Sequence, residues 1–236
     1  MAKRLFDLIV TVLAAPAWVP VILLTSIAIF LTSGWPVFYV SVRRVYRSRS
    51  IKEFKFRTMV RNAHKLVNRD TVPITKQHFL NLPINCGLYT RLGRVIERLS
   101  FTEFPQLFHV LTGHMTLVGN RPLPENVISS LKTQYPFVEE RFNARCGLTG
   151  PVQLVGRQMI NDEQRLRLEI AYGEFCNNCY SPRIDLWLLW STVMICLRLR
   201  PLYDFKTVHS ILRQTIDSAN HATQDGNYVP SSPPQN

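Results

Sequence analysis

The sequence predicts a small mixed α/β globular domain with an N-terminal re-entrant membrane helix hairpin and interfacial amphipathic helices. Three observations lead to this fold class. Residues 5–31 form a nearly uninterrupted apolar run, short alternating segments follow it, and apolar residues recur at helical spacing further along. We expect a membrane-embedded re-entrant helix over residues 1–35, a globular domain over 36–216 and a disordered tail over 217–236.

Composition narrows the class of protein. The chain has 236 residues, of which 46% are hydrophobic and 19% charged, which excludes a wholly disordered chain. The sequence also argues against a polytopic membrane protein, because such a protein would carry several long apolar runs. Lys and Arg number 28 against 16 Asp and Glu, a net charge of +12 that implies an anionic partner. We expect no nucleic acid, because phosphorylated ligands and anionic lipid beside an apolar anchor explain the charge.

The apolar run is long enough to cross a bilayer, which needs about 20 residues. A cleaved signal peptide fits poorly, because the run is too long and no small-residue cleavage site follows. Basic residues mark the cytoplasmic side, and they stand on both sides of the run, at Lys3, Arg4, Arg43, Arg44, Arg47, Arg49, Lys52 and Lys55. Pro16 and Pro20 interrupt the run. We therefore favour a hairpin that bends near Val19–Pro20. A straight span remains the alternative.

The rest of the chain shows both the alternation typical of strands and the spacing typical of helices. Alternation predicts strands at Val37–Val42 and Glu53–Phe56. Helical spacing is seen at 93–112, from Pro122–Glu125 onward, at 162–177 and at 183–199. Within the first of these segments, Thr102 as an N-cap competes with a capping box over Ser100–Glu103. The last segment is too short for a span and is expected to be an interfacial or a buried helix.

Several motifs occur in a fixed order along the chain. They read KRLFD at 3–7, KFRTM at 55–59, FTEFPQLFHVLTGHMTLVGNRP at 101–122 and CGLTGPVQLVGR at 146–157. Together they resemble the bacterial sugar transferase family, the monotopic polyprenyl-phosphate phosphoglycosyl transferases that start glycan assembly on a lipid carrier. The resemblance covers most of the chain.

The resemblance implies a reaction and a location. In the family, the Asp of an Asp-Glu pair attacks the phosphate of a UDP-sugar and expels the nucleoside monophosphate. A polyprenyl phosphate then takes the phosphosugar, and a magnesium ion assists. The implied location is the cytoplasmic face of the bacterial inner membrane, at the first step of exopolysaccharide or other surface glycan assembly.

One catalytic position departs from the family pattern. Glu103 matches the second carboxylate, but Thr102 stands where the family has the nucleophilic Asp, and His114 and Asn120 are further departures nearby. A threonine hydroxyl is a weak nucleophile until a base removes its proton. His109 or His114 is a candidate base if the fold brings it close. Otherwise the chain is a catalytically deficient relative that binds nucleotide sugar, lipid carrier or an active partner.

Five basic residues match family motifs and are the expected substrate-binding residues: Lys55, Arg57, Arg98, Arg121 and Arg145. Arginine grips phosphate with a bidentate fork. We expect the four arginines to converge with Glu103 on one anion site of positive potential near the membrane surface. Glu103 is the expected magnesium ligand, with most of the shell supplied by water and substrate. The sequence names neither the sugar nor the oligomeric state, and a homo-oligomer stays open.

Overall fold

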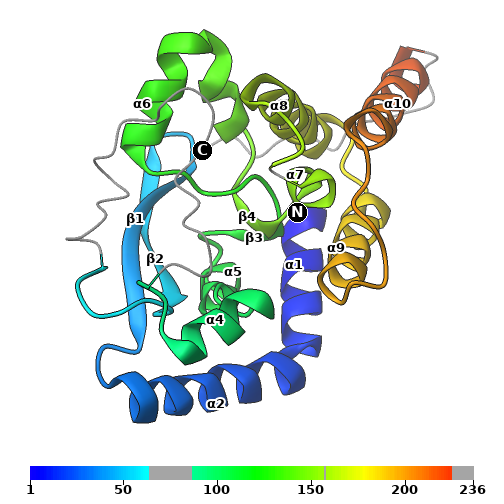
Figure 1. The fold of residues 1–236 in the computed structure, drawn as a ribbon. Coiled ribbons are helices and arrows are strands. Elements are labelled where there is room, and N and C mark those ends of the chain that lie inside the picture. The colour runs from blue at the N-terminus through cyan, green and yellow to red at the C-terminus, as the bar shows by residue number, and fades with distance from the viewer. Residues whose placement is uncertain (64–86, 157, 225–236) are drawn as a thin grey trace.

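The computed structural model describes residues 1–63, 87–156 and 158–224 (Figure 1). Its helices are α1 (Ala2–Leu13), α2 (Ala15–Ser33), α4 (Arg91–Arg98), α5 (Leu107–Leu111), α6 (Glu125–Gln134), α7 (Pro151–Val155), α8 (Asp162–Asn178), α9 (Pro182–Cys196) and α10 (Phe205–Gln224), with short 3₁₀ helices η1 (Phe104–Gln106) and η2 (Pro136–Phe142). Its strands are β1 (Phe38–Tyr46), β2 (Arg49–Phe56), β3 (Thr116–Val118) and β4 (Gly147–Thr149). The expected mixture of helices and strands is confirmed.

Strands β1 and β2 form an antiparallel hairpin at the edge of the domain (Figure 1). Both strands predicted from the alternation are present, and each is longer than expected. Successive side chains of a strand point to opposite faces. One face of the hairpin carries Ser41, Arg43, Glu53 and Lys55, and the other carries Val40, Val42, Lys52 and Phe54. The first set lines the candidate site described below.

The centre of the domain holds a short parallel pair, β3 and β4, with α1, α5 and α9 packed around it. The backbones approach closely where these strands end. A Cβ on Gly119 would lie 2.5 Å from the carbonyl oxygen of Arg145, so the position accepts only glycine. This close approach ties the segment that follows β3 to the segment that leads into β4.

Helix α10 packs against α8 through Val208, Leu212 and Ile216, which are all buried. The helix continues to Gln224. The expected start of a disordered tail at Asp217 is therefore wrong, because the apolar stripe of α10 docks the helix onto α8 and carries it past that residue. Residues 225–236 lie outside the described part of the chain.

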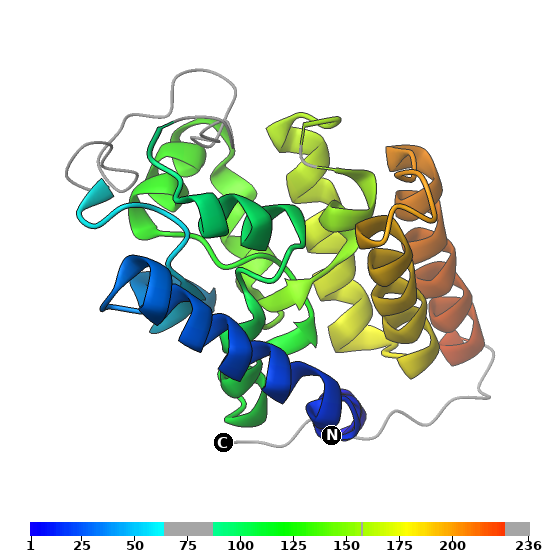
Figure 2. The same cartoon turned by 60° about the horizontal axis from the view of Figure 1, so that its bottom comes forward.

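The apolar N-terminal run forms two helices that meet at Ala14 and run in clearly different directions (Figures 1 and 2). The bend expected near Val19–Pro20 is therefore misplaced. Pro20 lies inside α2 without ending it, and Pro16 lies in the first turn of α2, where a missing N–H costs nothing. Of the described helices, α2 alone is long and apolar enough to cross a membrane, by length and composition.

Helix α1 turns its polar residues toward the protein. Asp7 and Thr11 are buried, while Leu5, Ile9 and Val12 are exposed. The Asp7 Oδ1 atom accepts a hydrogen bond from the backbone N–H of Leu117 in β3 at 3.0 Å. An apolar helix that begins the chain is thus fastened to the globular domain by its polar side.

Further polar contacts fasten the first turn of α1. Arg4 donates to the carbonyl oxygens of Val110 and Leu111 at the end of α5. Lys3 forms an ion pair with the buried Asp185 of α9, with Nζ 2.6 Å from Oδ2. The N-terminus of the chain is therefore held at the junction of α5, β3 and α9.

Candidate active site

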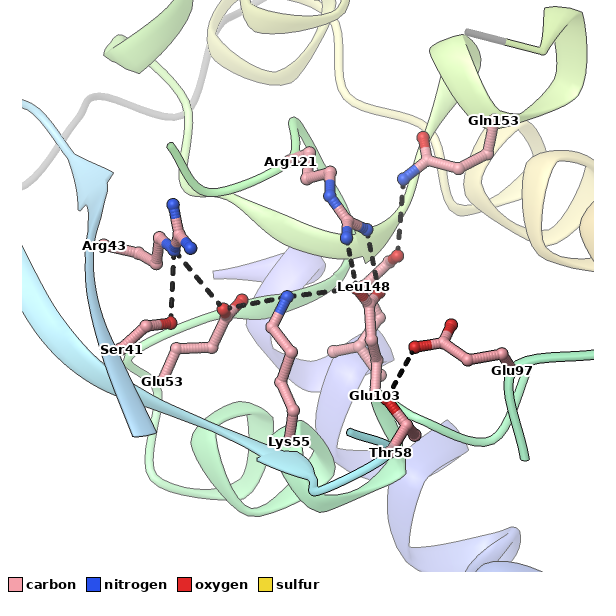
Figure 3. A network of polar contacts seen from close by, with 10 residues as sticks. All are labelled: Ser41, Arg43, Glu53, Lys55, Thr58, Glu97, Glu103, Arg121, Leu148 and Gln153. Atoms are coloured by element: carbon pink, nitrogen blue, oxygen red, sulfur yellow. Dashed lines mark hydrogen bonds and ion pairs between the residues drawn. The ribbon is translucent and has the colours of Figure 1, made fainter. Parts of the chain in front are cut away.

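The centre of the site is a clamp between Glu103 and Arg121 (Figure 3). The guanidinium of Arg121 donates to both carboxylate oxygens of Glu103, with Nη1 2.9 Å from Oε2 and a second, shorter bond from Nη2 to Oε1. The ammonium of Lys55 lies 3.4 Å from the same carboxylate. Three residues that the motifs single out are thus in direct contact.

Different parts of the fold deliver these three side chains. Glu103 is the N-cap residue of η1, so the expectation that it begins a helix is confirmed. Lys55 comes from β2, and Arg121 follows β3. Neither expected cap forms: Ser100 has a positive φ of 59°, and η1 has no side-chain cap at all.

The loop that carries Arg121 is fixed by buried hydrogen bonds. Asn120 donates through Nδ2 to the carbonyl oxygens of Arg141 and Glu169, and Arg141 donates to the carbonyl oxygen of Arg121 at 2.8 Å. Burial by itself would raise the pKa of Glu169, but the guanidinium groups of Arg141 and Arg165 outweigh it and lower that pKa to about 2. Asn120, one of the departures from the family pattern, thus has a definite structural role.

A second carboxylate lies beside the clamp. Glu53 is only 3% exposed, and its Oε2 atom lies 3.2 Å from Lys55 Nζ and 3.8 Å from Arg43 Nε. Figure 3 shows the resulting row of alternating charges, Arg43, Glu53, Lys55, Glu103 and Arg121. Sequence reasoning missed Glu53, although its place two residues before Lys55 on a strand puts both on one face.

A third carboxylate, Glu97, accepts a hydrogen bond from Thr58 at 2.9 Å (Figure 3). Burial lowers the pKa of Arg121, but the charges of Glu103, Glu53 and Glu97 raise it by more, so the net direction is upward. The expectation of one carboxylate among several bases is therefore wrong. Acidic and basic side chains alternate in this site, and each of the bases Arg43, Lys55 and Arg121 lies beside a carboxylate.

The hydroxyl of Thr102 is buried and has no hydrogen-bond partner among the described residues. The backbone carbonyl oxygen of Thr102 accepts a hydrogen bond from the N–H of Phe56 at 3.0 Å. His114 Nδ1 lies 2.7 Å from the hydroxyl of Thr112, and the ring of His109 stacks on Phe54. In residues 1–63, 87–156 and 158–224, therefore, no base is within hydrogen-bond reach of the Thr102 hydroxyl.

The remaining predicted substrate-binding residues lie elsewhere. Arg57 donates to the carbonyl oxygens of Ser33 and Gly34, at 2.6 and 2.8 Å, and so caps the end of α2. Burial lowers its pKa, with a smaller contribution from Arg61.

Arg145 donates to the carbonyl oxygen of Gly113 at 2.9 Å and lies over the ring of Tyr46. Arg98 is exposed at the end of α4. The expected convergence holds for Arg121, joined by Lys55, and is wrong for Arg57 and Arg145, because backbone carbonyls, and not Glu103, hold their guanidinium groups.

The described residues contain no group of three or more His, Cys, Asp or Glu side chains that could hold a metal ion. Both oxygens of Glu103 are engaged by Arg121. Magnesium commonly binds through one or two carboxylates together with substrate phosphates and water. Glu103 fits that pattern once Arg121 has another anion to grip.

The fold and site define a class of protein: a globular domain fastened to an apolar helix pair, with a carboxylate–guanidinium site beside a β-hairpin. The family model for bacterial sugar transferases matches residues 1–199, and the chain belongs to that family. Helix α10 lies beyond the matched residues.

Curated relatives agree with this assignment. Over 89% of its length the chain is 30% identical to a UDP-N-acetylgalactosamine-undecaprenyl-phosphate N-acetylgalactosaminephosphotransferase of Aeromonas hydrophila, of which it covers 43%. It is 32% identical, over 83% of its length, to an undecaprenyl-phosphate glucose phosphotransferase of Komagataeibacter xylinus, of which it covers 34%. The chain is 29% identical to the uncharacterized sugar transferase EpsL of Bacillus subtilis, over 94% of its own length and 94% of the length of that protein. The chain thus spans less than half of the first and second of these proteins and nearly all of the third.

Proposed function

We propose that this chain is a membrane-bound phosphoglycosyl transferase that moves a phosphosugar from a UDP-sugar to a polyprenyl phosphate. The reaction would be the first step of exopolysaccharide or other surface glycan assembly. The observation that carries the proposal is the bidentate clamp of Arg121 on Glu103, with Lys55 beside it. The three residues occupy the positions where the family motifs place a carboxylate and two phosphate-binding bases.

The clamp suggests how the donor binds. Carboxylate and phosphate present similar pairs of oxygens to a guanidinium fork. A donor diphosphate can therefore replace the Glu103 carboxylate on Arg121, and Lys55 can contact the same anion. Released from Arg121, Glu103 is the residue that would hold magnesium, which would neutralise charge on the diphosphate.

The way in which the helix pair is held supports membrane attachment on one face. Asp7 fixes α1 to β3, and Arg57, the residue after β2, fixes the C-terminal end of α2. Because both ends of the pair are bound to one globular domain, we propose that the pair dips into one leaflet and leaves on the same, cytoplasmic, side. A straight span would require α2 to give up the burial of Trp18, Ile22 and Ile29. The exposed Leu186, Trp190 and Val193 of α9 support an interfacial position for that helix too.

A second candidate function rests on the Thr102 hydroxyl. Transfer requires a nucleophile that attacks the sugar-bearing phosphorus while uridine monophosphate leaves. Without a base at hand, the Thr102 hydroxyl keeps its proton and attacks poorly. This observation favours a catalytically deficient homologue that binds nucleotide sugar, lipid carrier or an active partner.

A transfer assay separates the two candidates. Membranes containing the full chain are incubated with polyprenyl phosphate and a panel of radiolabelled UDP-sugars, and lipid-linked phosphosugar is measured. Activity that is lost in Thr102→Ala supports a threonine nucleophile. An inactive parent that gains strong activity as Thr102→Asp supports the deficient homologue. No product from the parent or from Thr102→Asp with any sugar contradicts the transferase proposal.

Donor binding tests the clamp independently of turnover. We expect Arg121→Ala to weaken UDP-sugar binding by about 1.5–3 kcal/mol, the range for a hydrogen bond to a charged group. Arg167→Ala, which removes an exposed arginine of α8, is the matched control and should bind as the parent does. Titration calorimetry measures both, and equal affinity in parent and Arg121→Ala contradicts the proposed donor site.

A further inference from the structure

The β1–β2 hairpin has an exposed apolar face whose partner none of the motifs explains. Val40, Val42 and Phe54 are 45%, 62% and 39% exposed. Val40 pairs with Phe54 across the hairpin, and Val42 pairs with Lys52. These three apolar residues, the outer hairpin face, lie on the side of the hairpin opposite Glu53 and Lys55.

Two ring contacts, made by adjacent residues of α5, connect this face to α2. Phe54 stacks on His109 of α5, with ring centroids 5.1 Å apart. The preceding residue, Phe108, is 51% exposed, and its ring meets Trp18 of α2 edge to face at 5.5 Å. The exposed rings of Phe108 and Phe54 therefore lie beside α2, joined to it through the buried Trp18 and the half-buried His109.

We infer that the outer hairpin face rests against the same lipid surface as α1 and α2. The inference rests on the proposed membrane attachment and adds a third element to it. Apolar side chains next to an anchored helix pair lose exposed area when they enter the interfacial region. Lys52, beside Val42 and on the same face, can keep its ammonium among anionic headgroups while its stem lies along the apolar surface.

The position of the hairpin gives this contact a consequence for the site. Side chains of one strand alternate between the two faces, so β2 presents Phe54 to the lipid and its neighbours Glu53 and Lys55 to the charged site. The two-stranded sheet is then the single layer of backbone that separates the lipid from the charged site. It would place Lys55 close to the headgroup level, where the phosphate of a polyprenyl carrier lies.

Photo-crosslinking tests the contact in the full chain. A benzoylphenylalanine is placed at position 42 or 54, the protein is bound to phosphatidylglycerol–phosphatidylcholine vesicles, and adducts are identified by mass spectrometry. Position 24 on α2, occupied by the 65% exposed Leu24, reports on membrane attachment itself. The control is position 217, which is exposed on α10, a helix at the opposite end of the domain from α2 (Figure 1). We expect lipid adducts from 24, 42 and 54 and none from 217.

The other outcomes separate the two proposals. Lipid adducts at 24 but not at 42 and 54 overturn the hairpin contact and leave membrane attachment standing. No lipid adduct at any position contradicts membrane attachment as well. Adducts from 42 or 54 to a second copy of the chain or to another protein show a protein interface and overturn the inference.

A charge substitution gives a second readout. Because Val42 is exposed, Val42→Asp should leave thermal unfolding in detergent unchanged and lower the fraction of protein that sediments with the vesicles. Gln214→Asp places the same charge on the exposed side of α10 and should sediment as the parent does. Equal sedimentation of Val42→Asp and Gln214→Asp contradicts the inference.

Discussion

Helices α1 and α10 are both amphipathic and both pack on the domain, yet α10 turns its apolar side toward the protein and α1 turns its polar side. Helix α10 buries Val208, Leu212 and Ile216, as a helix in water does. Helix α1 buries Asp7 and Thr11 and exposes Leu5, Ile9, Val12 and Leu13. The exposed side of α10 suits water, and the exposed side of α1 suits the apolar medium that the proposed membrane attachment supplies.

The contrast also shows what holds each helix. Apolar burial stabilises α10, and its directed contact to α8, between Arg213 and Glu174, is a largely exposed ion pair. Helix α1 depends on directed contacts, since Asp7 must meet the N–H of Leu117 and Lys3 must meet Asp185. Substitutions that leave apolar packing intact should therefore disturb α1 far more than α10.

The largest effect should come from the same substitution made on both helices. Leu212 is fully buried, so Leu212→Ala should lower the free energy of unfolding by about 2–5 kcal/mol. Leu5 is 60% exposed on the outer side of α1, and Leu5→Ala should change the free energy of unfolding by less than about 0.5 kcal/mol. Denaturant unfolding in detergent measures both. Equal losses would mean that α1 is packed by its apolar side, contrary to the comparison.

The next effect is the pH dependence of α1 docking. Burial raises the pKa of Asp7 to about 6 from 3.8, although Lys3 and the Leu117 N–H oppose the rise. For an acid with a raised pKa, the stabilising contribution is complete below pH 3.8 and is lost as the pH rises through 6. Stability should therefore fall by on the order of 3 kcal/mol across that window. In Asp7→Asn, which cannot titrate, this part of the pH profile should be flat, and an unchanged profile would contradict the assignment.

A smaller effect is expected when the acceptor on α1 is deleted. Asp7→Ala leaves the buried N–H of Leu117 without its partner, which should cost about 1–3 kcal/mol. Asp217→Ala on α10 removes an exposed carboxylate and should cost less than about 0.5 kcal/mol. Amide hydrogen exchange at Leu117 checks the mechanism directly: it should accelerate in Asp7→Ala and stay slow in Asp217→Ala.

Part of the candidate site could be predicted from the sequence, because motifs name residues whatever their surroundings. Lys55, Glu103 and Arg121 were singled out in this way, and the structure brings them together. Arg57 and Arg145 were singled out on the same grounds, but backbone carbonyls take up their donors. Glu53 carries no motif signal, and only the pairing of the strands places it beside Lys55 and Arg43.

The sequence by itself determined what depends on near neighbours along the chain. The start of α8 is an example, where Asn161 and Gln164 form a reciprocal cap three residues apart. The strands of the hairpin and the family motifs are of the same kind. Tertiary structure alone decided that the apolar run bends at Ala14 and which side of α1 turns inward. The partners of α1 lie far along the chain, since Lys3 meets Asp185 across 182 positions. It also decided that the Thr102 hydroxyl has no base within reach in the described chain, since that depends on which distant side chains the fold brings to one point.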